Sequence, residues 1–258
     1  MTHDMKINTD RLPPAIAKPV RVFCEMFIWG HASNLESVAV YGSAITPNFI
    51  PKVSNINLVC IFNSINLETL RLSLPSLKFG SKFRIEPPLF FTMDYIKSSL
   101  ATFPMEFLEI IENHVTIYGD EKLNGLVVPR HNLRLQCEQQ IKSLLLRMRQ
   151  AYLEHGKNQK VLRMIIKDSF NNLFPIFRCL LRLENKPIPD NYEDVIMKIS
   201  YLYQIDGQFF VDIFRDKRKT EKIIWTEIER IYQDFINHLE IIGGKVERFQ
   251  IDETTEKP

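Results

Sequence analysis

The residues VAVYGS at positions 38–43 and NINLVCIF at positions 55–62, separated by eleven residues, decide the fold of this chain. Apolar and β-branched residues dominate both stretches, which is typical of strands, and the Gly-Ser pair that ends the first stretch indicates a turn. Side chains two residues apart on a strand lie on the same face, so Asn55 and Asn57 are expected to point to one side. The two stretches therefore predict neighbouring strands with a Gly-Ser turn and two asparagines at their ends.

The composition is that of an ordinary globular protein, with 45% hydrophobic and 25% charged residues over 258 positions. This length allows one large domain or two of ordinary size. The net charge of +2 is too balanced to indicate a nucleic-acid or membrane surface, so we expect neither partner.

The four cysteines lie far apart in apolar stretches, and no pair has the spacing of zinc ligands. We expect buried free thiols, as in a reducing compartment. Residues 1–19 lack the apolar core of a signal peptide, and no window reaches the roughly 18 apolar residues of a membrane helix. These features predict a cytoplasmic protein.

Strands and helices alternate before residue 129. Residues 1–18 are expected to form a loosely held arm, and residues 19–128 a small α/β domain with a mixed sheet and flanking helices. The predicted strands are 37–42, 56–62, 89–92 and 115–118. The predicted helices are 19–35, one beginning at Leu67 and interrupted by Pro75 and Gly80, 94–99 and 104–113.

After Pro129 the apolar residues recur at three- and four-residue steps almost to the end of the chain. Residues 129–250 are therefore expected to form an all-α helical bundle, and residues 251–258 a disordered tail. The predicted helices are 130–155, 159–184, 191–203 with Asp190 as its cap, 207–216, and 220–242 with Gly243 and Gly244 as its stop. The chain as a whole is predicted to be α+β.

The spacing of Asn55 and Asn57 can be compared with that of the metal ligands in phosphoryl and nucleotidyl transfer. These reactions depend on positioning and charge neutralisation. Two magnesium ions commonly hold the attacking and leaving oxygens, and magnesium requires hard, anionic oxygen ligands. An Asp-x-Asp pair on one strand supplies two such ligands on one face.

Residues 41–44, YGSA, followed by residues 54–59, SNINLV, resemble the Gly-Ser … Ser-Asp-x-Asp-Leu signature of the polymerase-beta-like nucleotidyltransferases. The order of an α/β part followed by helices is similar to that of the bacterial aminoglycoside nucleotidyltransferases and of minimal nucleotidyltransferase–HEPN proteins. The resemblance implies that Gly42 and Ser43 contact nucleotide phosphate and that positions 55 and 57 bind metal.

This chain departs from the family at its metal ligands. Asn55 and Asn57 are neutral, and the strand expected at 89–92, which would carry the third carboxylate, has none. Glu86 is the nearest candidate carboxylate, and Asp94 lies past the strand. We therefore expect no metal site, and a nucleoside triphosphate site formed by Gly42, Ser43, Asn55 and Asn57.

These residues favour a pseudoenzyme: a nucleotidyltransferase-fold protein that binds a nucleotide or a partner in the cleft between its domains. An alternative is an active nucleotidyltransferase that uses Mg²⁺ with atypical ligands and transfers a nucleoside monophosphate to a small molecule or protein. A further alternative is a structural or regulatory protein without nucleotide binding. No catalytic residue is assigned.

Two features of the helical part suggest further roles. Arg149 and His155 have a spacing that resembles the ribonuclease motif of HEPN domains. A histidine at a helix C-terminus is also favoured by the helix dipole, and we adopt this explanation for His155. Phe170, Phe174 and Phe177 form an apolar ridge, which predicts a homodimer interface.

Overall fold

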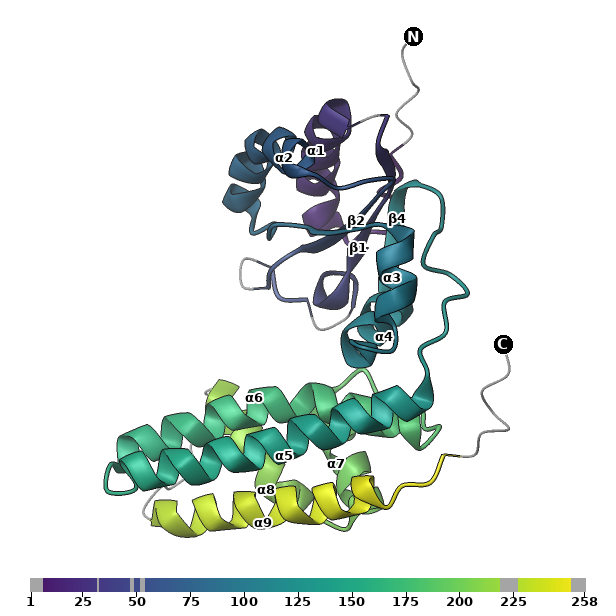
Figure 1. Cartoon of the computed structure of the whole chain (residues 1–258). Helices are drawn as coiled ribbons and strands as arrows, with labels where there is room; N and C mark the ends of the chain where they lie inside the picture. Colours follow the sequence, from purple (N-terminus) through teal and green to yellow (C-terminus); the bar gives the residue numbers. More distant parts are fainter. Residues whose placement is uncertain (1–6, 32, 47–48, 52–53, 219–226, 252–258) are drawn as a thin grey trace. The chain divides into compact units, whose positions relative to one another are not determined.

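The computed structural model describes residues 7–31, 33–46, 49–51, 54–218 and 227–251. The chain divides into two compact units, one ending at Val128 and the other beginning at Pro129 (Figure 1). The first unit contains a mixed four-stranded sheet with flanking helices, and the described residues of the second unit are organised as helices. This architecture confirms the predicted α+β fold class.

The sheet of the first unit has the strand order β3-β2-β1-β4. β1 is antiparallel to both β2 and β4, and β2 is parallel to β3. The strands are β1 (Leu35–Tyr41), β2 (Asn57–Phe62), β3 (Leu89–Phe91) and β4 (His114–Gly119). All four lie close to the segments that the sequence predicts.

Each face of this sheet supports its own apolar core. Even-numbered β2 residues such as Leu58 and Cys60 pack with α1 (Pro14–His31) and with the end of α2 (Leu67–Gly80). Val59 and Ile61, on the opposite face, pack with α3 (Met93–Ser99) and α4 (Pro104–Glu112). Figure 1 shows the two helix pairs on opposite sides of the sheet. This alternation fixes which face of β2 each polar residue occupies.

The described part of the predicted N-terminal arm, residues 7–18, is not loosely held. Ile7 and Leu12 are buried in the first core, and the Asn8 N–H donates to the Ile117 carbonyl at 2.8 Å. The helix also begins earlier than predicted, at Pro14, a residue that suits the first turn because that position needs no N–H donor.

Helix α2 presents its side chains in the reverse of the usual pattern. Asn66 caps it, and Pro75 lies within it without interrupting it, whereas the helix ends at Gly80, where the sequence predicts a break. Its buried residues are small and polar, and the Ser73 hydroxyl lies 3.0 Å from Nε2 of His31 on α1. Leu67 and Leu74 are exposed. Small residues thus let α2 approach α1 closely, and all leucines of α2 except Leu77 are exposed.

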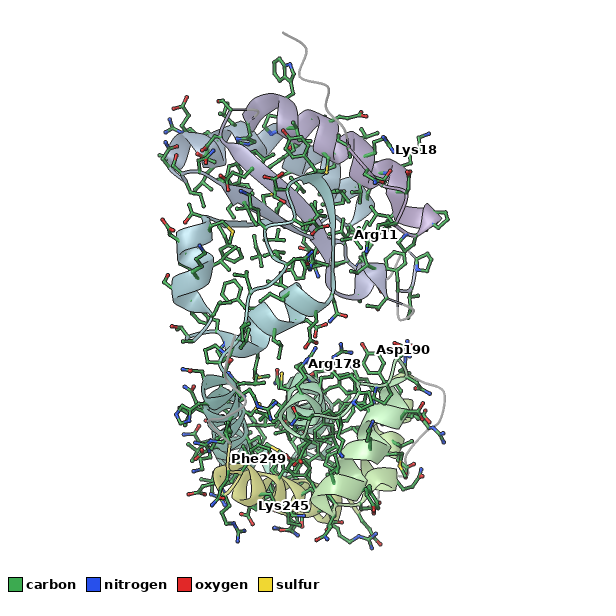
Figure 2. All side chains as sticks on the ribbon, turned by 90° about the vertical axis from the view of Figure 1, so that its right-hand side faces the viewer. Arg11, Lys18, Arg178, Asp190, Lys245 and Phe249 are labelled. Atoms are coloured by element: carbon green, nitrogen blue, oxygen red, sulfur yellow. The ribbon has the colours of Figure 1, made fainter. Side chains whose placement is uncertain are left out.

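The second unit contains α5 (Arg130–His155), α6 (Gln159–Leu183), α7 (Tyr192–Tyr203), α8 (Gly207–Arg218) and α9 (Ile228–Glu247). Two predicted helix ends are wrong. The cap of α7 is Asn191, whose side chain accepts from the Glu193 N–H; Asp190, labelled in Figure 2, precedes it. Helix α9 continues through Gly243 and Gly244 to Glu247. The expected start at 220 and the tail from 252 lie outside the described residues.

The phenylalanine ridge of α6 is inside the second unit. Phe170, Phe174 and Phe177 are at most 8% exposed. The Phe177 ring lies 5.6 Å from that of Phe210 on α8, and the Phe174 ring stacks at 4.3 Å on Tyr192. The surface on which the homodimer prediction rested is therefore not available, because these rings already pack against each other.

All four cysteines are buried and free, as predicted. Among the described residues, the helices lack the combination of length and apolar character needed to cross a membrane.

Candidate functional site

The Gly-Ser turn lies at the end of β1. Gly42 begins a short 3₁₀ helix, η1 (Gly42–Ile45), with a φ of 76°, a conformation that glycine adopts without strain. The Gly42 N–H donates to the Asn113 carbonyl at 3.0 Å, and both the N–H and the hydroxyl of Thr46 donate to the Ser43 carbonyl. The turn is thus fixed from both sides, and Ser43 is half-buried within it.

The two asparagines lie at the start of β2. Asn57 is the first strand residue and pairs in register with Tyr41, the last residue of β1. Asn55 precedes the strand, while Ile56 forms an isolated parallel bridge with Ile85. Because Ile56 is buried in the α1–α2 core, Asn55 and Asn57 fall on the opposite face, the one covered further along by α3 and α4.

A Cβ added to Gly42 would lie 3.6 Å from Nδ2 of Asn57. Gly42, its neighbour Ser43 and Asn57 are therefore close in space. Asn55 lies next along the same edge, so the four residues named from the sequence belong to one end of the sheet.

The segment before β3 adds two charged residues to this end. The Ile56 N–H donates to the Arg84 carbonyl, and the Glu86 N–H donates to the Ile56 carbonyl, at 2.8 and 3.0 Å. This parallel pairing places Arg84 beside Asn55 and Glu86 beside Asn57. Nη2 of Arg84 donates to Oδ1 of Asn55 at 2.7 Å. Glu86 is a candidate carboxylate from the sequence, whereas no sequence pattern points to Arg84.

The other neighbour of β1 contributes a second polar group. Tyr41 pairs in register with His114 on β4. Oε2 of Glu121 accepts from the Thr116 hydroxyl at 2.7 Å and lies 3.3 Å from Nε2 of His114, whose Nδ1 lies 2.8 Å from the Ile111 carbonyl. Burial raises the pKa of Tyr41. The Glu121 carboxylate is thus engaged by its own neighbours.

A buried donor lies next to the turn. Nδ2 of Asn113 is buried and has no hydrogen-bond partner among the described residues, and the carbonyl of the same residue accepts from the Gly42 N–H. A buried amide that lacks a partner is rare in native proteins and needs an explanation. An acceptor on a ligand bound at the turn would supply one.

The side chains at this end of the sheet do not fit a magnesium clamp. Magnesium prefers anionic oxygens in octahedral geometry, but positions 55 and 57 supply neutral amides, and Oδ1 of Asn55 already accepts from a guanidinium. Glu86 is the carboxylate that the pairing brings near. Within the described part of the chain, no group of three His, Cys, Asp or Glu residues could hold a metal ion.

The described part of the helical unit has open surface pockets, and His155 lines one of about 1000 Å³ near the corner between α5 and α6. Arg149 is paired with Glu240 of α9 at 2.6 Å. Six residues on a helix correspond to a rotation of about 240° from one side chain to the other. The structure therefore does not bring Arg149 and His155 together.

No family model matches this chain, and no curated protein matches it. Among solved structures, it resembles the spectinomycin adenyltransferase AAD(9) of Enterococcus faecialis, crystallised with ATP and spectinomycin. The match has 12% sequence identity and a TM-score of 0.53, and covers 86% of this chain and 98% of the other. Such coverage extends beyond either unit alone. This likeness shows a nucleotidyltransferase-like fold.

Proposed function

We propose that this chain is a nucleotidyltransferase-fold pseudoenzyme that binds a nucleoside triphosphate at the end of its sheet. The binding residues are Gly42, Ser43, Asn55 and Asn57. The observation that carries the proposal is the placement of Asn57 against the Gly-Ser turn, where a Cβ on Gly42 would lie 3.6 Å from its amide. The ATP-bound state of the similar adenyltransferase supports a nucleotide as the ligand.

The chemistry of the site supports binding without metal-dependent transfer. The amides of Asn57 and Asn113 and the hydroxyl of Ser43 are hydrogen-bond donors, which suit the acceptor oxygens of phosphates. The carboxylates that would hold two dications against those phosphates are replaced by amides. We further propose that residues 19–128 form the nucleotide-binding domain and that residues 129–250 form a HEPN-like helical domain.

A second candidate is an active transferase with atypical metal ligands. The position of Glu86, beside Asn57 in the parallel pairing, favours it, because this carboxylate could share a magnesium ion with the side-chain carbonyl oxygen of Asn57. Incubation with labelled nucleoside triphosphates, Mg²⁺ and candidate acceptors tests this alternative. Transfer that is abolished by Glu86→Gln would establish it over the pseudoenzyme.

Isothermal titration calorimetry of the full chain with ATP tests the proposed binding. The expected result is saturable binding with one site per chain, measured both with Mg²⁺ and with EDTA. The absence of binding heat in both conditions, supported by no ATP-induced rise in Tm, would favour a structural or regulatory protein instead.

Gly42→Ala offers a test of the turn with a matched control. Gly42 and Gly125 have φ values of 76° and 79°, so alanine at either position is expected to destabilise the fold by about 1–2 kcal/mol. A Cβ on Gly125 would meet no atom of the described residues within 4 Å, whereas one on Gly42 would lie 3.6 Å from Asn57. Urea denaturation should show similar losses for both variants, and calorimetry should show weakened ATP binding for Gly42→Ala alone. Equal ATP affinities in the two variants would remove the turn from the site.

A further inference from the structure

The backbone around Arg84 is held in an uncommon conformation. Arg84 follows the short helix η2 (Ser81–Phe83) in the left-handed region, with a φ of 60°. A non-glycine residue in this region is uncommon. Its N–H donates to the Ser81 carbonyl, and its carbonyl accepts from Ile56. Two neighbouring segments thus fix Arg84 at the start of β2.

The side chain of Arg84 is directed to the asparagines by a neutral partner. Its Nη2 donates to Oδ1 of Asn55 at 2.7 Å. An aspartate at position 55 would form an ion pair with the guanidinium and neutralise it. Asparagine accepts the same hydrogen bond and leaves the positive charge uncompensated by this contact. With aspartate at position 55 the site would favour a bound metal ion. With asparagine there, the site instead presents the positively charged guanidinium of Arg84 in a fixed orientation.

An arginine suits this role for chemical reasons. The guanidinium carries five N–H donors in a planar fork that matches phosphate oxygens, and only one of its nitrogens is used by Asn55. It is also permanently charged, so it can balance phosphate charge as a magnesium ion would.

From these observations we infer that the site takes a metal-free nucleoside triphosphate, with Arg84 as the counter-charge for its phosphates and Asn55 as the positioning residue for Arg84. This inference rests on the proposed nucleotide binding. A magnesium ion on the triphosphate lowers its negative charge and is repelled by the guanidinium, so magnesium weakens binding. The carboxylate of Glu86, which lies beside Asn57 in the pairing, repels the negatively charged phosphates.

Calorimetry with ATP, in EDTA and in excess Mg²⁺, tests this inference on the full chain. Wild-type protein should bind ATP more tightly in EDTA than in excess Mg²⁺. Arg84→Gln should weaken binding in EDTA by about tenfold or more, as expected for losing a charge-assisted hydrogen bond. Asn55→Ala should weaken it less, and Glu86→Gln should strengthen it. Arg71→Gln, which removes an exposed cation from α2, is the matched control and should leave the affinity unchanged.

The outcomes separate the two proposals. ATP binding that requires Mg²⁺, or an Arg84→Gln variant with wild-type affinity, would overturn the role of Arg84 while leaving nucleotide binding in place. The absence of ATP binding to wild-type protein in both conditions would overturn the proposed function itself. If Arg84→Gln lowers the Tm, Arg84→Lys serves as the second variant, because it keeps the charge but loses the planar fork. It should bind ATP with an intermediate affinity. A wild-type affinity in Arg84→Lys would overturn the role of the planar fork and leave only that of the positive charge.

Discussion

Asn55→Asp combined with Asn57→Asp is expected to make ATP binding depend on magnesium. The double variant places two carboxylates on one face of the start of β2, beside Glu86 on the paired segment. Because the charge of the ligands sets the affinity of oxygen-ligand metal sites over orders of magnitude, Mg²⁺ should tighten ATP binding by about tenfold or more. Calorimetry with and without Mg²⁺ measures this change.

Arg84 should limit the effect. A carboxylate at position 55 would pair with its guanidinium, which already donates to that side chain. The gain from Mg²⁺ is therefore expected to be larger when Arg84→Gln is added to the double variant, so the three substitutions should not be additive.

The matched control for the double variant is Asn124→Asp combined with Asn237→Asp. Both asparagines are exposed, and neither is among the residues of the proposed site, so this control adds the same charge elsewhere. It should leave the response to Mg²⁺ unchanged. If the Asn55 and Asn57 variant behaves like the control, the correspondence of these positions with the metal ligands of the nucleotidyltransferases is wrong.

The largest loss of stability is expected for Asp216→Asn in the second unit. The Asp216 side chain is 1% exposed and lies 3.0 Å from Nη2 of Arg163 and 2.6 Å from Nζ of Lys167. It joins α8 to α6. Removing one partner of a buried ion pair typically costs about 3–5 kcal/mol, and because both cations are partly exposed we expect about 3 kcal/mol here.

Urea denaturation measures the loss, with Asp212→Asn as the control on the same helix. Asp212 accepts from Gln208 and is only half-buried, so its replacement should change the free energy of unfolding by less than about 0.5 kcal/mol. Similar urea midpoints for the two variants would mean that the ion pairs of Asp216 do not stabilise the helical unit more than the exposed contacts of Asp212 do.

Local patterns allowed much of the fold to be predicted from the sequence. The two strands around the Gly-Ser turn and helices α5 and α6 follow from short-range signals, namely β-branched runs and apolar repeats. The placement of Arg84 could not be predicted, because it depends on a parallel pairing between residues 29 positions apart. No local pattern encodes that register.

Two errors have packing as their cause. Gly243 was interpreted as a helix stop, but α9 continues, and a Cβ at this position would lie 3.3 Å from Cγ2 of Ile141 on α5. The glycine thus permits a close helix contact. In α2 an uninterrupted passage through Pro75 was not predicted; there the Ser73 and Ser76 hydroxyls are satisfied by carbonyls of their own helix, which lets this small face be buried against α1.

A crystal structure of the full chain with ATP and Mn²⁺, with anomalous differences recorded for manganese, is the most direct test of the two amides at positions 55 and 57. The expectation is phosphate density against Gly42, Ser43 and the Arg84 guanidinium, and no anomalous peak between the side chains of Asn55 and Asn57. A well-occupied manganese ion held there, with Glu86 as a ligand, would contradict it.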